Sequence, residues 1–155
     1  YLNEPEKTRE VIVEMEGRRW YKTGDKGHLD ADGFLTIVDR YSRFAKIGGE
    51  MISLTAVEGE VRAVLQQPEL ELVAVNVPDE KKGEQIVLLV AGPADYETIK
   101  AALLAEKCNP LMIPSQLINT EAVPKLGSGK TDFNAARALV LQKLPAQGNQ
   151  TLSQN

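Results

Sequence analysis

The segment with the clearest chemical potential is Leu126–Thr131, which reads Leu-Gly-Ser-Gly-Lys-Thr. Gly127 and Gly129 predict an exposed, flexible loop from which Lys130 extends a single ammonium group. Lysine is a compact point charge on a long stem, which suits contact with a mobile phosphate or carboxylate. A solvated lysine in front of a helix is the alternative, and these residues by themselves do not exclude it.

The same segment is not a nucleotide-binding P-loop, although Gly-Lys-Thr ends that motif. The first glycine of a P-loop would stand five positions before Gly129, where the sequence has Pro124. The loop whose backbone amides would bind the phosphates therefore lacks its first glycine, and we exclude a P-loop nucleoside triphosphatase.

Two further charged positions lie earlier in the chain. Asp25 ends the turn-rich segment Trp20–Asp25. The aspartate of a Gly-Asp pair in a loop usually caps a turn. A carboxylate in such a place can also accept hydrogen bonds from two neighbouring ribose hydroxyls. Arg40 follows the strand-like run Phe34–Val38 and reads most simply as part of a solvated basic edge. Neither residue alone decides a function.

Composition and charge exclude several classes of protein. The 155 residues are 43% hydrophobic and 26% charged, which is ordinary for a soluble globular chain of one domain or slightly more. The one cysteine, Cys108, excludes an internal disulfide, and with the one histidine, His28, it cannot form a usual zinc site. A net charge of −4 argues against a general nucleic-acid binder. These features indicate a cytoplasmic protein.

From residue 42 onward the pattern predicts a self-sufficient domain. A hairpin is expected around Gly48-Gly49, and Thr55 with Glu58 predicts a capping box at a helix that ends before Pro68. The helix 132–143 is expected to turn Phe133, Ala136, Val140 and Leu141 inward. The other predicted strands are 72–77, 86–91 and 117–123, and the other predicted helix is 95–107. We expect an α+β fold with a small, mostly antiparallel sheet of about three strands flanked by helices, plus a β-hairpin.

The first forty residues differ from the rest. They are rich in charge, and they predict a short helix followed by a β-hairpin whose turn contains Asp32-Gly33. They hold too few apolar residues for a core of their own. The last ten residues carry no charge and are rich in Gln and Asn, which predicts a disordered tail.

Taken in order, five segments resemble the successive C-terminal motifs of the adenylate-forming superfamily, which contains acyl-CoA synthetases, nonribosomal-peptide adenylation domains and luciferases. Within the superfamily, Arg43–Leu54 and Leu126–Phe133 resemble in particular the bacterial bifunctional acyl-[acyl-carrier-protein] synthetase/2-acylglycerophosphoethanolamine acyltransferases. The five segments are Tyr21–Asp25, Asp39-Arg40, Lys46–Ile52, Glu58 and Pro124–Lys130.

The resemblance implies a domain organisation. Residues 1–41 would be the C-terminal remnant of a large adenylation domain, 42–143 a mobile C-terminal lid, and 144–155 a disordered tail. The missing N-terminal adenylation domain would carry the nucleotide-binding phosphate loop and the acyl pocket, and the acyltransferase domain would be missing as well. This piece is therefore expected to be inactive alone. The full-length protein is expected at the cytoplasmic face of the bacterial inner membrane.

The resemblance also implies a reaction. A fatty acid and ATP would form acyl-AMP and pyrophosphate, with Mg²⁺ bound mainly by the missing N-terminal domain. Lys130 would be the catalytic residue that bridges the carboxylate and the α-phosphate, while Asp25 and Arg40 would bind the ribose and phosphate of ATP or AMP.

The second step implied is acyl transfer to the phosphopantetheine thiol of acyl-carrier protein, with CoA as the alternative acceptor. The loop containing Gly48, Gly49 and Glu50 would face the pantetheine arm. Ser42 would be the hinge of the lid, although the superfamily usually has Asp or Lys at that place.

A different class of function remains open from the residues alone. The chain could be a non-catalytic interaction module that binds an acidic partner through a basic dock. Such a dock needs its four cations on one exposed face, and they are Arg43, Lys46, Lys81 and Lys82.

Overall fold

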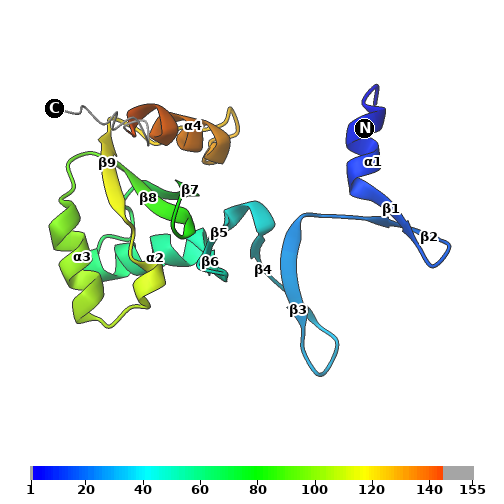
Figure 1. Cartoon of the computed structure of the whole chain (residues 1–155), viewed down its shortest axis with the longest axis horizontal. Helices are drawn as coiled ribbons and strands as arrows, with labels where there is room; N and C mark the ends of the chain where they lie inside the picture. The colour runs from blue at the N-terminus through cyan, green and yellow to red at the C-terminus, as the bar shows by residue number, and fades with distance from the viewer. Residues whose placement is uncertain (1, 145–155) are drawn as a thin grey trace, which may run out of the picture. The chain divides into compact units, whose positions relative to one another are not determined.

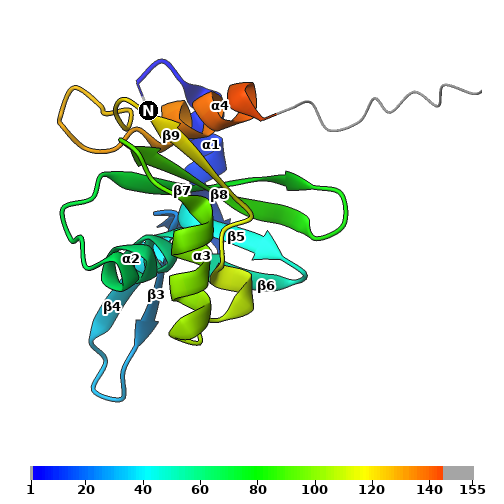
Figure 2. The same cartoon turned by 90° about the vertical axis from the view of Figure 1, so that its left-hand side faces the viewer.

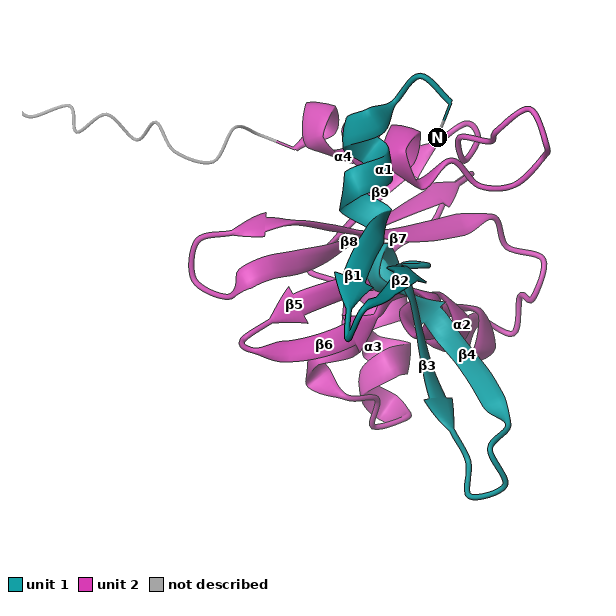
Figure 3. Ribbon diagram, turned by 90° about the vertical axis from the view of Figure 1, so that its right-hand side faces the viewer, with its two compact units in different colours: residues 1–43 teal, residues 44–155 magenta. Residues whose placement is uncertain are grey.

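A computed structural model describes residues 2–144 of the chain (Figure 1). The chain divides into two compact units, with the boundary between Arg43 and Phe44 (Figure 3). This boundary lies two residues beyond the expected one. The predicted disordered tail, apart from residue 144, lies outside the described residues.

The first unit consists of one short helix, two separate antiparallel hairpins and a terminal 3₁₀ turn. Every residue from 2 to 42 is exposed or only half-buried, so this unit has no closed core of its own. Its elements are α1 (Pro5–Val11), β1 (Ile12–Met15), β2 (Arg18–Tyr21), β3 (Asp25–Leu29), β4 (Leu35–Arg40) and η1 (Tyr41–Arg43).

The predicted hairpin is present as β3–β4. Its turn is held by Asp30, whose carboxylate accepts hydrogen bonds from the backbone amides of Asp32 and Phe34 at 3.0 and 2.9 Å. The β1–β2 hairpin was not predicted. Its turn places Glu16 and Gly17 at φ 54° and 71°, and glutamate is not a residue that marks a left-handed turn in a sequence.

The second unit contains a five-stranded sheet flanked by helices, which confirms the α+β prediction. Strand β8 lies in the middle of the sheet. It pairs with β7 on one edge, and on the other with β5 near its start and with β9 further along. Only the β8–β9 pair is parallel. The elements are β5 (Phe44–Ile47), β6 (Glu50–Ser53), α2 (Leu54–Leu65), β7 (Leu72–Asp79), β8 (Gly83–Ala91), α3 (Tyr96–Ala105), η2 (Pro110–Met112), β9 (Gln116–Thr120) and α4 (Phe133–Lys143).

The sheet has five strands where about three were expected, because the 44–53 hairpin joins it. The contact that joins them is the pairing of Ile47 with Gly83 at the start of β8. The two paired residues are 36 positions apart, so no local sequence pattern predicts the pairing.

The core lies on both faces of the sheet. Helices α2 and α3 lie on one face and α4 on the other (Figure 2). Along β8, Leu88 packs toward α2 and α3 whereas Leu89 packs toward α4, as the two-residue period of a strand requires. Both side chains are fully buried, which stabilises the fold by roughly 1.5–3 kcal/mol each.

Two local predictions were wrong. The N-cap of α2 is Ser53, whose hydroxyl accepts a hydrogen bond from the Ala56 amide at 3.2 Å, so Thr55 and Glu58 form no capping box. In α4, Phe133 and Leu141 are 44% and 43% exposed rather than inward. The short residues Ala136 and Val140 alone are fully covered, because the helix sits close to the sheet.

Candidate functional site

The segment that carries Lys130 is exposed, as predicted, and it forms a tight hairpin. Lys125 and Thr131 pair as an antiparallel bridge. The Leu126 amide donates to the Lys130 carbonyl at 2.7 Å, and the Gly129 amide donates to the Leu126 carbonyl at 2.8 Å. Gly129 has φ 83°, a conformation that glycine adopts without strain. The backbone of Lys130 is therefore held in one place.

The side chain of Lys130 lies on the surface of this hairpin. It is exposed, and within residues 2–144 its ammonium group makes no hydrogen bond or ion pair. Directly after the hairpin, the carboxylate of Asp132 caps α4 by accepting from the Ala135 amide at 3.0 Å. The hairpin thus presents a cation outward from a fixed base.

Asp25 and Arg40, which the sequence places 15 positions apart, are neighbours across the β3–β4 hairpin. The guanidinium Nε of Arg40 lies 3.2 Å from the Asp25 Oδ1 atom, and their side chains are 70% and 27% exposed. The Asp25 amide also donates to the Thr23 hydroxyl at 3.1 Å. A carboxylate that can accept from hydroxyls and a cation that can bind phosphate are thereby brought together.

The Gly48-Gly49 pair forms the two-residue turn between β5 and β6. Their φ values of 59° and 94° need glycine, and a Cβ at either position would meet no other atom within 4 Å. The Gly48 amide donates to the Lys82 carbonyl at 2.9 Å, so this turn lies beside the β7–β8 turn. Glu50 follows and is exposed. Backbone is therefore accessible here from outside.

The Gly48-Gly49 turn and the Lys130 hairpin lie on opposite sides of the second unit. Figure 2 shows the β5–β6 turn far from the loop between β9 and α4.

Ser42 lies in the 3₁₀ turn η1, which ends where the second unit begins. Its assignment as a hinge stays a prediction. The neighbouring Arg43 is only 4% exposed, which contradicts its place in an exposed basic dock. Lys46, Lys81 and Lys82 are exposed, but Asp79 and Glu84 lie among them, accepting hydrogen bonds from their backbone amides.

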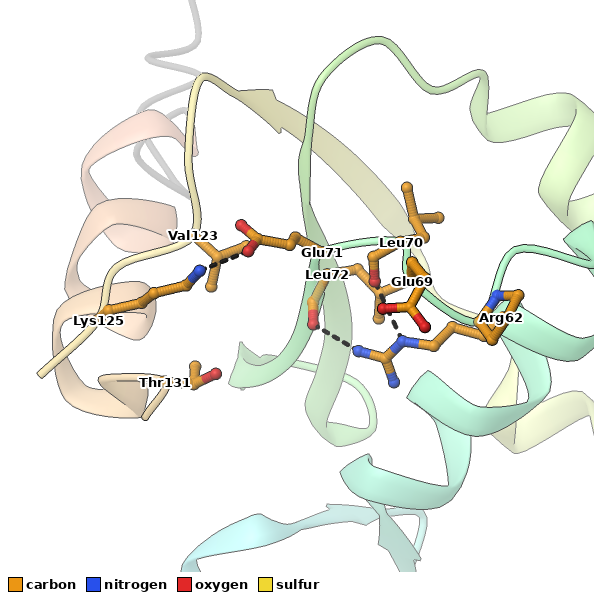
Figure 4. A pocket seen from close by; sticks show the side chains of 9 residues that line it. Arg62, Glu69, Leu70, Glu71, Leu72, Val123, Lys125 and Thr131 are labelled. Carbon is orange, nitrogen blue, oxygen red and sulfur yellow. Dashed lines mark hydrogen bonds and ion pairs between the residues drawn. The ribbon is translucent and has the colours of Figure 1, made fainter. Parts of the chain in front are cut away.

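Sequence reasoning did not single out a cavity of about 380 Å³ beside the Lys130 hairpin (Figure 4). Its lining includes Arg62 of α2, Glu71 at the entry to β7, and Lys125 and Thr131 at the base of the hairpin. Lys125 forms an ion pair with Glu71. No local pattern could have found this pair, because its members are 54 positions apart.

The remaining reactive groups do not form a second centre. Desolvation by burial, with the nearby Glu60 carboxylate, raises the pKa of the Cys108 thiol, which disfavours the nucleophilic thiolate. Among residues 2–144, no three His, Cys, Asp or Glu side chains are grouped to hold a metal ion. None of the helices in this part of the chain has the length and apolar character needed to cross a membrane.

No protein-family model matches the chain. Three curated relatives are similar along most of it. They are phenyloxazoline synthase MbtB of Mycobacterium sp. (30% identity over 96% of this chain), 2-succinylbenzoate–CoA ligase of Listeria monocytogenes (33% over 86%) and long-chain-fatty-acid–CoA ligase FadD13 of Mycobacterium tuberculosis (33% over 84%). The chain spans 13%, 28% and 25% of their respective lengths.

Solved structures are similar as well. A fatty acyl CoA synthetase of Mycobacterium tuberculosis aligns with 94% of this chain at a TM-score of 0.63 and 28% identity. The O-succinylbenzoate CoA synthetase MenE of Bacillus subtilis, in complex with AMP, aligns with 86% at a TM-score of 0.64 and 27% identity. The chain covers 28% and 26% of these two structures. In sequence and in fold, the chain matches the C-terminal domain of the adenylate-forming synthetases.

Proposed function

We propose that this chain is the C-terminal lid portion of an AMP-forming acid–thiol ligase acting on a fatty acid. The whole protein would first convert the fatty acid and ATP to acyl-AMP and pyrophosphate. It would then transfer the acyl group to a phosphopantetheine thiol. The observation that carries the proposal is the exposed ammonium of Lys130 on a hydrogen-bonded hairpin.

Charge explains why such a lysine is needed in the first step. A carboxylate and the α-phosphate of ATP are both anions, and negative charge accumulates between them as they react. A cation held in position before the reaction opposes this repulsion without reorganising, and removing one such group commonly costs about 3–4 kcal/mol in the barrier. Lys130 meets the requirement, since its carbonyl accepts a hydrogen bond from the Leu126 amide and its ammonium is free to reach a ligand.

The Asp25–Arg40 pair supports a nucleotide role for the first unit. The Asp25 carboxylate would accept from the ribose hydroxyls, and the exposed guanidinium of Arg40 would bind ribose or phosphate. Mg²⁺ would accompany ATP and would be bound mainly by the N-terminal part of the adenylation domain.

The exposed apolar side chains of the first unit support a continuation of its fold in further polypeptide. Phe34, Leu29 and Leu35 are 71%, 67% and 62% exposed, although side chains of this size are usually buried. We propose that they pack against the remainder of a large adenylation domain, to which residues 1–41 would belong.

The opposite placement of the Lys130 hairpin and the Gly48-Gly49 turn supports a lid that rotates between the two steps. In one orientation Lys130 would face the active site. In the other, the glycine turn would face it, and its exposed backbone, with Glu50, would line the path of the pantetheine arm. Ser42 would absorb the change in backbone angles between the two orientations.

Acyl-carrier protein is the thiol acceptor that we propose, with CoA as the alternative. The proposal rests on the sequence of Arg43–Leu54, which resembles the corresponding segment of the bifunctional acyl-carrier-protein synthetase/acyltransferases. The full-length protein would then reacylate lysophosphatidylethanolamine at the cytoplasmic face of the bacterial inner membrane. The relatives that are named CoA ligases favour the alternative, so the acceptor needs a direct measurement.

The decisive experiment is Lys130→Ala in the full-length protein. Fatty-acid-dependent exchange of pyrophosphate into ATP should fall about 10²–10³-fold. Thioester formation from supplied acyl-adenylate should be largely spared, measured with acyl-carrier protein and with CoA in parallel. Lys143→Ala is the control, at another exposed lysine of this unit whose ammonium donates to the Asn119 carbonyl at 3.4 Å, and it should leave both steps unchanged. Unimpaired exchange in Lys130→Ala would refute the proposal.

A further inference from the structure

The cavity beside the Lys130 hairpin lies between three segments that are distant in sequence. Figure 4 shows Arg62 of α2, Glu71 at the entry to β7 and Lys125 at the base of the hairpin around it. The cations at this cavity are already engaged. Arg62 donates to two carbonyl oxygens and Lys125 pairs with Glu71. The cavity therefore lies where α2, the start of β7 and the hairpin are bonded to one another, and its cations are not free to bind a ligand.

Arg62 fixes the segment that leads into β7. Its Nε donates to the Leu70 carbonyl at 3.1 Å, and its Nη2 donates to the Leu72 carbonyl at 3.2 Å. The carbonyl of Glu71, between them, accepts from the Ala91 amide of β8 at 2.9 Å. The backbone on both sides of the Glu71 side chain is thus bonded to α2 and to the sheet.

Glu71 then holds the hairpin. Its carboxylate and the Lys125 ammonium point toward each other across the cavity (Figure 4). Lys125 is also the residue that bridges to Thr131, next to Lys130. An unbroken series of bonds therefore runs from α2 through Arg62, the Glu71 segment and Lys125 to the backbone that carries Lys130.

We propose that Glu71 and Lys125 are positioning residues for Lys130, and this inference rests on the function proposed above. Their side chains are 48% and 47% exposed, so the pair adds little to the free energy of unfolding. Its effect is on geometry. A displacement of about 1 Å in a group that orients reacting atoms can slow a reaction about 10²-fold.

The test uses Glu71→Gln and Lys125→Met in the full-length protein, with the two half-reactions measured separately. Each variant should lower kcat for fatty-acid-dependent pyrophosphate exchange about 10–100-fold, with KM for ATP changed less than about threefold. Thioester formation from supplied acyl-adenylate should stay near the wild-type rate, because the hairpin does not serve that step. The charge-reversed double variant, Glu71→Lys with Lys125→Glu, should recover most of the lost exchange.

Glu69→Gln is the matched control, because Glu69 lines the same cavity without an ion pair among the described residues. It should exchange pyrophosphate at the wild-type rate. Wild-type exchange in both single variants, no recovery in the double variant, or an equal loss of both half-reactions would each overturn the inference. Lys130→Ala separates the two proposals. If it abolishes exchange while the pair variants have no effect, only the positioning role fails.

Discussion

Side chains of like charge have very different surroundings in this protein, and their surroundings decide what they can do. The ammonium of Lys130 is exposed and makes no bond within residues 2–144, whereas Lys125, five positions earlier, is paired with Glu71. Among the acids, Glu58 is only 8% exposed, and its Oε1 atom accepts a hydrogen bond from the Ala74 amide at 2.8 Å. Lys130 is available to a ligand, whereas Lys125 and Glu58 are already bonded to other parts of the fold.

Glu58→Ala should destabilise the second unit by about 1–3 kcal/mol, because the buried Ala74 amide would lose its acceptor. Chemical denaturation followed by circular dichroism measures this change. Glu58→Gln keeps a carbonyl acceptor and should lose less. Glu69→Ala, at an exposed acid, should stay within about 0.5 kcal/mol of wild type. A Glu58→Ala variant as stable as that control would show that the bond contributes nothing.

Short-range hydrogen bonds determine where the elements of the second unit begin. Helices α2, α3 and α4 each start at a side-chain cap, provided by Ser53, Asp95 and Asp132. The Lys130 hairpin lies between a buried Val123 and the cap of α4, so both of its ends are attached to the core. The backbone of the hairpin is therefore anchored at both ends, and the exposed side chain of Lys130 is available to a ligand.

The cap of α3 predicts an acid-dependent loss of stability. Hydrogen bonds from the hydroxyl and then the amide of Thr98 hold the pKa of Asp95 below its ordinary value. Because the folded pKa is the lower one, the stabilisation is complete above the unfolded pKa and is lost as pH falls through the folded pKa. The stability difference between wild type and Asp95→Asn should therefore shrink below about pH 4.

Unfolding free energies measured from neutral to acidic pH test this expectation. A difference between Asp95→Asn and wild type that stays constant with pH would contradict the linkage.

The chain consists of two units, which differ in how much apolar surface they bury. The second unit has two hydrophobic clusters, one on each face of its sheet. The first has two separate two-stranded hairpins, and residues 2–42 include no fully buried side chain. Isolated two-stranded hairpins are marginal in water, since they bury too little apolar surface to offset the entropy of ordering.

Chains truncated to residues 44–144 and to residues 2–43 should therefore behave differently. The first should unfold cooperatively, with a Tm within a few degrees, about 5 °C, of the transition in the whole chain. The second should show no cooperative transition. Thermal melts by circular dichroism distinguish the cases. Cooperative unfolding of residues 2–43 alone would contradict the view that this unit needs further polypeptide.

Much of the fold could be predicted from local patterns. Short apolar runs bounded by turn residues identified β7 and β8, Asp32-Gly33 identified the β3–β4 turn, and Asp95 identified the start of α3. These signals depend on neighbours within a few positions, so the sequence carries them in full. The β1–β2 hairpin was not predicted because Glu16 in its turn takes a left-handed conformation, which glutamate does not favour.

The sequence by itself determined the α+β class and the order of most elements, and it singled out Lys130, Asp25 and Arg40 as candidate site residues. Only the tertiary structure decided that Asp25 lies against Arg40, that Arg43 is buried, that Ile47 joins the hairpin to β8, and that Glu71 holds Lys125. The physical reason is the range of the interactions. The periods of helices and strands are determined by residues close together in the sequence. Partners that are 15 to 54 positions apart meet only when the chain has folded.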